Sequence, residues 1–119
     1  MKIAISTSGE TLDSPVDPRF GRAAGFLVVD TDTGAATYAT NAQNLSLAQG
    51  AGIQAAMNVA NTGATTVITG HVGPKAFTAL SKGNIAIYFA EGGSVAQALA
   101  ALAAGTLEQA SGADKPGHW

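Results

Sequence analysis

The second half of the chain alternates β-branched apolar runs with stretches of helical periodicity, and this alternation constrains the fold more than any other feature. The runs at residues 65–69 and 85–89 predict buried strands. A helical pattern of small side chains precedes the first run, and a predicted helix over residues 74–83 separates the two. A strand reached through a helix crossover runs parallel to the strand before it. We therefore expect both runs to lie parallel to the strand at residues 3–6.

The first half of the chain predicts a different arrangement. Apolar runs at residues 3–6, 26–30 and 35–39 indicate three strands with no helix between them. Thr31-Asp32-Thr33-Gly34, between the second and third of these, is typical of a turn. These strands can form an antiparallel meander, so we expect a mixed five-stranded sheet.

Helix-end signals place the first helix from Leu47 to about Gly63. Asn44 or Ser46 can cap its start, and Gly63 stands where a left-handed C-terminal residue belongs. Met57 falls in the middle of this helix. Its thioether could contact copper(I), but we interpret it as a side chain that fills the core.

The third helix is expected over residues 94–105, because Ser94 and Gln97 have the spacing of a capping box. Beyond it, residues 106–119 are polar and are expected to form a loose tail, which leaves one domain over residues 1–105. The order of elements predicts an α/β fold of the ribonuclease-H-like kind, with helices packed on a sheet of three antiparallel and two parallel strands.

Composition excludes several classes of protein. The chain has 119 residues, a net charge of −2 and no cysteine. Nucleic-acid binding by phosphate neutralisation requires a clearly basic domain. No apolar run is long enough to cross a membrane or to act as a signal peptide. We therefore expect a soluble cytoplasmic protein that binds neither nucleic acid nor membrane.

The long loop over residues 7–24 carries both arginines of the chain, Arg19 and Arg22. Loops of this length without regular structure are often functional. Arginine is suited to planar, multi-contact binding of anions. The loop leaves the first strand at its carboxyl end, where ligands of open α/β sheets bind.

Two further loops leave the same edge of the predicted sheet, at residues 70–73 and 91–94. Each leads into a helix N-terminus, whose free N–H groups and dipole favour anions. With Lys75 added to the two arginines, the pattern indicates a small cationic pocket. The alternative is that these glycines only make turns and that Pro74 and Ser94 only cap helices.

Two residues of these loops allow more than one interpretation. His71 can donate a hydrogen bond or bind a metal, or it can be an ordinary surface histidine. The other histidine, His118, lies in the tail, and metal sites need several converging ligands. Phe20 can form an apolar wall of the pocket or anchor the loop to the core.

No arrangement of residues indicates catalysis. The first strand lacks the carboxylate that two-metal nucleases of this fold require, and no serine–histidine–acid set is evident. We therefore expect no enzymatic activity. A phosphate-ester enzyme using the anion pocket is the weakest alternative, because no general base has an identifiable partner.

Four segments together resemble the dinitrogenase iron–molybdenum cofactor biosynthesis family. They are residues 3–9, 16–23, 50–52 and 69–76. The resemblance covers about the first hundred residues. It is strongest to small, cysteine-free members from sulfate-reducing bacteria, and it implies a ribonuclease-H-like fold.

The resemblance implies a function as well as a fold. Members of the family bind or carry metal–sulfur clusters, and the cysteine-free members bind a mixed molybdenum–copper sulfide cluster without covalent attachment. From gene context it also implies a MinD-like ATPase as a partner; we expect the chain itself to be a monomer. The alternative function is then a regulatory module for that ATPase, with cluster binding incidental. The family motifs carry the cluster-binding role onto Ser8, Arg19, Phe20, Gly21, Arg22, His71, Val72, Gly73 and Lys75.

Overall fold

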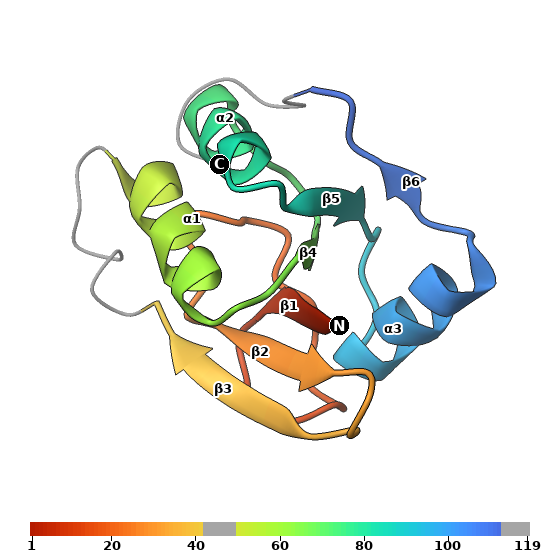
Figure 1. The fold of residues 1–119 in the computed structure, drawn as a ribbon. Coiled ribbons are helices and arrows are strands. Elements are labelled where there is room, and N and C mark those ends of the chain that lie inside the picture. Colours follow the sequence, from red (N-terminus) through yellow and green to blue (C-terminus); the bar gives the residue numbers. More distant parts are fainter. Residues whose placement is uncertain (42–49, 113–119) are drawn as a thin grey trace.

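The computed structural model describes residues 1–41 and 50–112 and forms a mixed six-stranded sheet covered by helices (Figure 1). The strands follow the order β3-β2-β1-β4-β5-β6 across the sheet. The elements are β1 (Lys2–Thr7), β2 (Gly25–Asp30), β3 (Ala36–Thr40), α1 (Ala51–Asn61), β4 (Thr66–Thr69), α2 (Pro74–Lys82), β5 (Ala86–Phe89), α3 (Val95–Ala104) and β6 (Glu108–Gln109).

The pairing of the first five strands confirms the predicted topology. β1 pairs antiparallel with β2, and β2 pairs antiparallel with β3. On its other edge β1 runs parallel to β4, and β4 runs parallel to β5. β1 therefore lies at the centre of the sheet, where Ile5 stands between Leu27 of β2 and Ile68 of β4.

The predicted strand number is wrong, because a sixth strand pairs with β5. Glu108 lies opposite Phe89, and the amide of Ala110 donates to the Ile87 carbonyl at 2.8 Å. Glu108 and Gln109 are exposed, so this strand is held by backbone hydrogen bonds and carries no apolar pattern. It falls in the segment expected to be a loose tail, while residues 113–119 lie outside the described part of the chain. The ribonuclease-H-like assignment stays a prediction.

The two faces of the sheet are covered by different helices. α1 and α2 lie side by side over one face and α3 covers the other (Figure 1). Because side chains alternate along a strand, Ala4 packs with Val59 and Leu80 beneath α1 and α2. Ile3 and Ile5 belong to the second apolar cluster, with Val95 and Ala98 of α3.

The helix ends agree with most of the local signals. Gly63 has a left-handed φ of 83°, Pro74 begins α2, and Ser94 and Gln97 form the predicted capping box. α1 begins at Ala51, after Gly50 with a left-handed φ of 79°, so a continuous helix from Leu47 is wrong; Leu47 and the predicted caps Asn44 and Ser46 themselves lie outside the described residues. The core position predicted for Met57 is wrong, because its side chain is 53% exposed.

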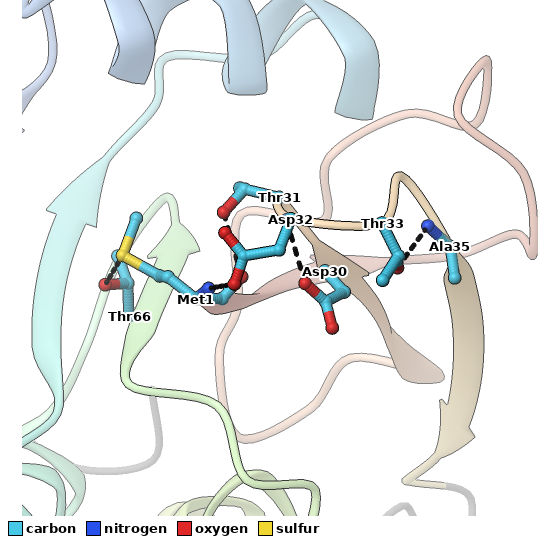
Figure 2. A network of polar contacts seen from close by, with 7 residues as sticks. All are labelled: Met1, Asp30, Thr31, Asp32, Thr33, Ala35 and Thr66. Atoms are coloured by element: carbon cyan, nitrogen blue, oxygen red, sulfur yellow. Dashed lines mark hydrogen bonds and ion pairs between the residues drawn. The ribbon is translucent and has the colours of Figure 1, made fainter.

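The turn between β2 and β3 is closed by a polar network that includes the chain terminus (Figure 2). The Met1 ammonium lies 3.0 Å from Asp32 Oδ2, and Asp30 Oδ1 accepts from the Asp32 amide at 2.9 Å. Thr33 Oγ1 accepts from the Ala35 amide at 3.2 Å. This network belongs to the end of the sheet where β1 begins, so these carboxylates fix the turn.

None of the helices in residues 1–41 and 50–112 has both the length and the apolar character that a membrane crossing requires.

Candidate functional site

The loop after β1 returns across the carboxyl ends of the central strands and brings Arg19 beside His71. The Asp17 amide donates to the Ser6 carbonyl at 2.8 Å, and Ser6 Oγ donates to the Asp17 carbonyl at 2.7 Å. Two residues later, Arg19 forms a parallel bridge with His71, and the Phe20 amide donates to the His71 carbonyl at 3.3 Å. The predicted neighbourhood of the arginine loop and the turn at residues 70–73 is therefore present.

A glycine makes this contact possible. A Cβ built on Gly70 would lie 2.6 Å from the Cα of Pro18 and 2.9 Å from its carbonyl oxygen. Those atoms belong to the backbone, so no side-chain movement could relieve the contact. Gly70 is thus required for the arginine loop to lie against β4.

Two of the candidate residues are core residues. Phe20 and Val72 are both fully buried, and the Phe20 ring centroid lies 5.3 Å from that of Phe26. Of the two interpretations of Phe20, the structure supports the anchor and not the wall of an open pocket. These side chains act on a site only by fixing the backbone on either side of them.

Asn41 fixes the second half of the loop and was not among the predicted residues. Its buried side chain donates from Nδ2 to the Ala23 carbonyl at 3.0 Å and to the Gly21 carbonyl at 3.4 Å. Its Oδ1 accepts from Asn58 of α1 at 2.8 Å. One amide side chain therefore ties the backbone beside Arg22 to α1.

The starts of α1 and α2 lie next to each other beneath this loop. A Cβ on Gly52 of α1 would lie 3.1 Å from the Cβ of Ala76 in α2. A Cβ on Gly21 of the loop would lie 3.1 Å from the Gly52 amide nitrogen. Small residues thus allow the two helix starts and the arginine loop to meet.

Neither of these helix starts is capped by the side chain of its own N-cap residue. α1 begins after Gly50 and α2 begins after Gly73, and neither glycine can offer a side-chain acceptor. The first-turn amides of Lys75 and Ala76 have no acceptor within residues 1–41 and 50–112. Free N–H groups and the positive end of the helix dipole make such a start suitable for an anion.

The start of α3 does not share this property, so its predicted contribution to an anion site is wrong. The amides of Val95 and Ala96 donate to the carbonyls of Ser14 and Leu12, each at 2.9 Å. The capping box uses the Gln97 amide. The loop after β1 therefore accepts hydrogen bonds from the first-turn amides of α3, which leaves few N–H donors for a ligand.

The carboxyl edge of the sheet contains a pocket of about 500 Å³, but it is not cationic. It is lined by Val16, Pro18, Gly70, His71, Phe89, Ala90, Glu91, Gly92 and Glu108. His71 is the candidate residue that borders it, and its charged lining residues are two glutamates. Lys75 instead lines a groove between α1 and α2. The three cations expected around one pocket therefore do not line it: Lys75 lies in the groove, and neither Arg19 nor Arg22 lines the pocket or the groove.

The remaining candidates differ in exposure. Ser8 is exposed, and Gly21 and Gly73 are buried. Arg19 is exposed, with its Nε 3.6 Å from Asp17 Oδ1, and the same oxygen accepts from the Arg19 amide at 2.9 Å. Arg22 is half-buried. The described residues contain no group of three or more histidines, cysteines or carboxylates that could hold a metal ion.

Comparison with known proteins gives one family and several related structures. The model of a family described as "Dinitrogenase iron-molybdenum cofactor" matches residues 1–105. The apo form of the orange protein from Desulfovibrio gigas is 45% identical with a TM-score of 0.93, and the match covers 96% of each chain. A Thermotoga protein assigned to the DUF35 family is 31% identical with a TM-score of 0.85, covering 98% of each chain. An uncharacterized protein of Methanocaldococcus jannaschii is 28% identical over 92% of this chain and 91% of its own.

Proposed function

The chain belongs to the dinitrogenase iron-molybdenum cofactor family, and from this premise we propose that it binds and carries an anionic metal–sulfur cluster without covalent attachment. The cluster is the cargo of the protein. The seat that we propose lies across the starts of α1 and α2, beside Arg19 and Arg22. No enzymatic step forms part of this function.

One observation carries the proposal: the start of α2, with its free first-turn amides, meets the start of α1 and the arginine loop at one place. Gly52 and Ala76 bring the helix starts together, and Gly21 brings the loop onto Gly52. The free amides of Lys75 and Ala76 supply hydrogen-bond donors. Because the dipoles of both helices are positive at these ends, they add to the charge of the guanidinium groups.

The donor set fits a sulfide-covered anion and not a bare metal ion. The chain has no cysteine, and its described residues offer no group of metal-ligating side chains. In a metal–sulfur anion the inorganic sulfides already ligate the metals, so the protein needs to supply only N–H donors and positive charge. The residues present meet that requirement.

The candidate residues take different parts in this proposal. Arg19, Arg22, His71 and Lys75 would approach the cluster, with backbone amides from the turn that ends at Gly73. Phe20, Gly21 and Val72 would act by holding the two loops in place, since all three are buried. Ser8 is exposed at the start of the same loop and would lie at the margin of the seat.

We further propose that the cluster is a molybdenum–copper sulfide. Support comes from the resemblance to the cysteine-free members of the family and from the 45% identity to the orange protein. Soft sulfide ligands suit copper(I), which in proteins is otherwise held by cysteine or methionine sulfur. A chain without cysteine can carry such a metal when the sulfide arrives with it.

A titration of the purified apo-protein with tetrathiomolybdate and copper tests the function. We expect a visible absorption band that co-elutes with the protein at a fixed ratio of metal to chain. The double variant Arg19→Ala/Arg22→Ala should bind about tenfold or more weakly, since two charged contacts are lost. Lys2→Ala removes a cation near the C-terminal end of α1 and serves as the control. A band that elutes free of protein would contradict the proposal. Equal cluster affinity in the Arg19→Ala/Arg22→Ala variant and in the Lys2→Ala control would contradict it too.

A further inference from the structure

A surface that shares Lys75 with the proposed seat runs along the groove between α1 and α2. This groove, of about 400 Å³, is lined by Ile53, Pro74, Lys75, Thr78, Ala79 and Lys82. After Pro74, the first residue of α2, the other four α2 residues follow the spacing i, i+3, i+4 and i+7 from Lys75, which places them on one face of the helix. The opposite face of α2 is buried through Ala76 and Leu80.

The groove and the surface of α1 beside it combine exposed apolar side chains with positive charge. Ile53 is 40% exposed, and Met57, one turn further along α1, is 53% exposed. Lys75 and Lys82 stand two helical turns apart, about 10 Å along the axis of α2. Ordinary core packing does not explain large exposed apolar side chains on a helix that already buries its other face.

The charge of this surface is opposite to that of the protein as a whole. The chain carries a net charge of −2, yet the sequences of α1 and α2 contain no aspartate or glutamate. Both charged residues lining the groove are lysines. A partner that bound here would need carboxylates near the ends of the groove and an apolar side chain at its centre.

We propose that the α1–α2 groove docks an acidic amphipathic helix of a partner protein. Two carboxylates of that helix, seven positions apart, match the separation of Lys75 and Lys82. Leucine-like side chains between them pack on Ile53 and Met57. This recognition is the helix-in-groove mode, with the lysines fixing the register and the apolar contact supplying most of the affinity. It does not depend on the cluster-binding function.

A synthetic helical peptide provides the probe. It carries two glutamates seven positions apart with two leucines between them on the same face. Titrated into the ¹⁵N-labelled full chain, it should shift the amide resonances of Ile53, Met57, Thr78 and Lys82 in a saturable manner. A peptide with lysines in place of the glutamates should bind at least about fivefold more weakly, since two favourable charge pairs become repulsive.

Matched protein variants test the same contacts from the other side. Lys82→Glu should weaken binding of the acidic peptide about fivefold. Lys2→Glu makes the same charge change outside the groove and should leave the affinity within about twofold. Chromophore formation with tetrathiomolybdate and copper should be unchanged in Lys82→Glu, so a failure here is distinguishable from a failure of the proposed cluster function.

Several results would overturn the proposal. The first is an absence of shifts at the groove residues, and the second is equal affinity of the two peptides. A dimer of the free protein in light scattering, with Ile53 and Met57 covered, would make a second copy the occupant. Saturation of the same amides by tetrathiomolybdate, with displacement of the peptide, would assign the groove to the anion.

Discussion

Gly70 lies directly against Pro18, so closely that a Cβ on Gly70 would come within 2.6 Å of the proline Cα. This contact joins the end of β4 to the loop that carries both arginines. It sets the distance between Arg19 and the turn at His71, which also share a parallel bridge. The geometry of the proposed seat therefore depends on the absence of one methyl group.

Gly70→Ala should destabilise the protein and weaken cluster binding together. The added methyl group meets backbone atoms, and overpacking of this kind typically costs about 1–3 kcal/mol. Urea unfolding measures the stability, and the tetrathiomolybdate–copper titration measures the binding. Gly112→Ala is the control, because a Cβ there meets nothing within 4 Å. Normal cluster binding by a destabilised Gly70→Ala variant would show that the contact between Gly70 and Pro18 does not affect the proposed seat.

Asn41→Ala should loosen the loop beside Arg22. The variant removes the Asn41 side chain from the carbonyls of Gly21 and Ala23 and from Asn58 Nδ2. Losing a buried hydrogen-bonding group of this kind costs about 1–3 kcal/mol. Asn61→Ala, at the exposed end of α1, should change the unfolding free energy by less than about 0.5 kcal/mol. Amide hydrogen exchange at residues 21–23 should quicken in the first variant alone.

Phe20 and Arg19 are neighbours with opposite expected effects. Phe20→Ala empties a fully buried site next to Phe26 and should cost about 3–5 kcal/mol. Arg19→Ala removes a long, 3.6 Å ion pair between an exposed guanidinium and the mostly buried Asp17 carboxylate, and should cost less than about 1 kcal/mol. Chemical denaturation measures both free energies. A large loss of stability in Arg19→Ala would mean that this arginine has a structural role.

Tyr38 makes stability sensitive to alkaline pH. Burial, with a smaller contribution from the charge of Glu10, raises the pKa of Tyr38 above its ordinary value of 10.0. The folded protein therefore binds the phenolic proton more tightly than the unfolded chain does. This contribution is intact below the unfolded-state pKa and is lost as the pH rises through the folded-state pKa.

Urea unfolding at several pH values checks this effect. The unfolding free energy of the wild type should fall more steeply above about pH 10 than that of Tyr38→Phe. Glu10→Gln should reduce the difference slightly, since Glu10 is the lesser cause. Parallel curves for the wild type and Tyr38→Phe would show that the phenol titrates alike in both states.

Local patterns predicted the elements of this fold but not every contact between them. The β-branched runs and the capping box of Ser94 and Gln97 are recognisable because each arises from residues close in sequence. β6 was not predicted, since Glu108 and Gln109 pair through backbone atoms and show no apolar pattern. Secondary structure held by main-chain bonds alone leaves little signal in the sequence.

The candidate site was predicted in part for the same reason. Arg19 and His71 were expected to meet because both follow central strands at the carboxyl edge of the sheet. The hydrogen bonds from the first amides of α3 to the carbonyls of Leu12 and Ser14 could not be foreseen, because they join residues far apart in the chain. Asn41 was missed for that reason too, since a single asparagine after a strand has no distinctive spacing.

The most direct test of the proposed seat is a two-dimensional NMR titration of the ¹⁵N-labelled apo-protein with a preassembled molybdenum–copper sulfide cluster. The account predicts that the largest shifts fall on the amides of Gly52, Lys75 and Ala76, with smaller ones at Arg19 and Arg22. Shifts confined to Phe89, Gly92 and the other residues around the glutamate-lined pocket would contradict it.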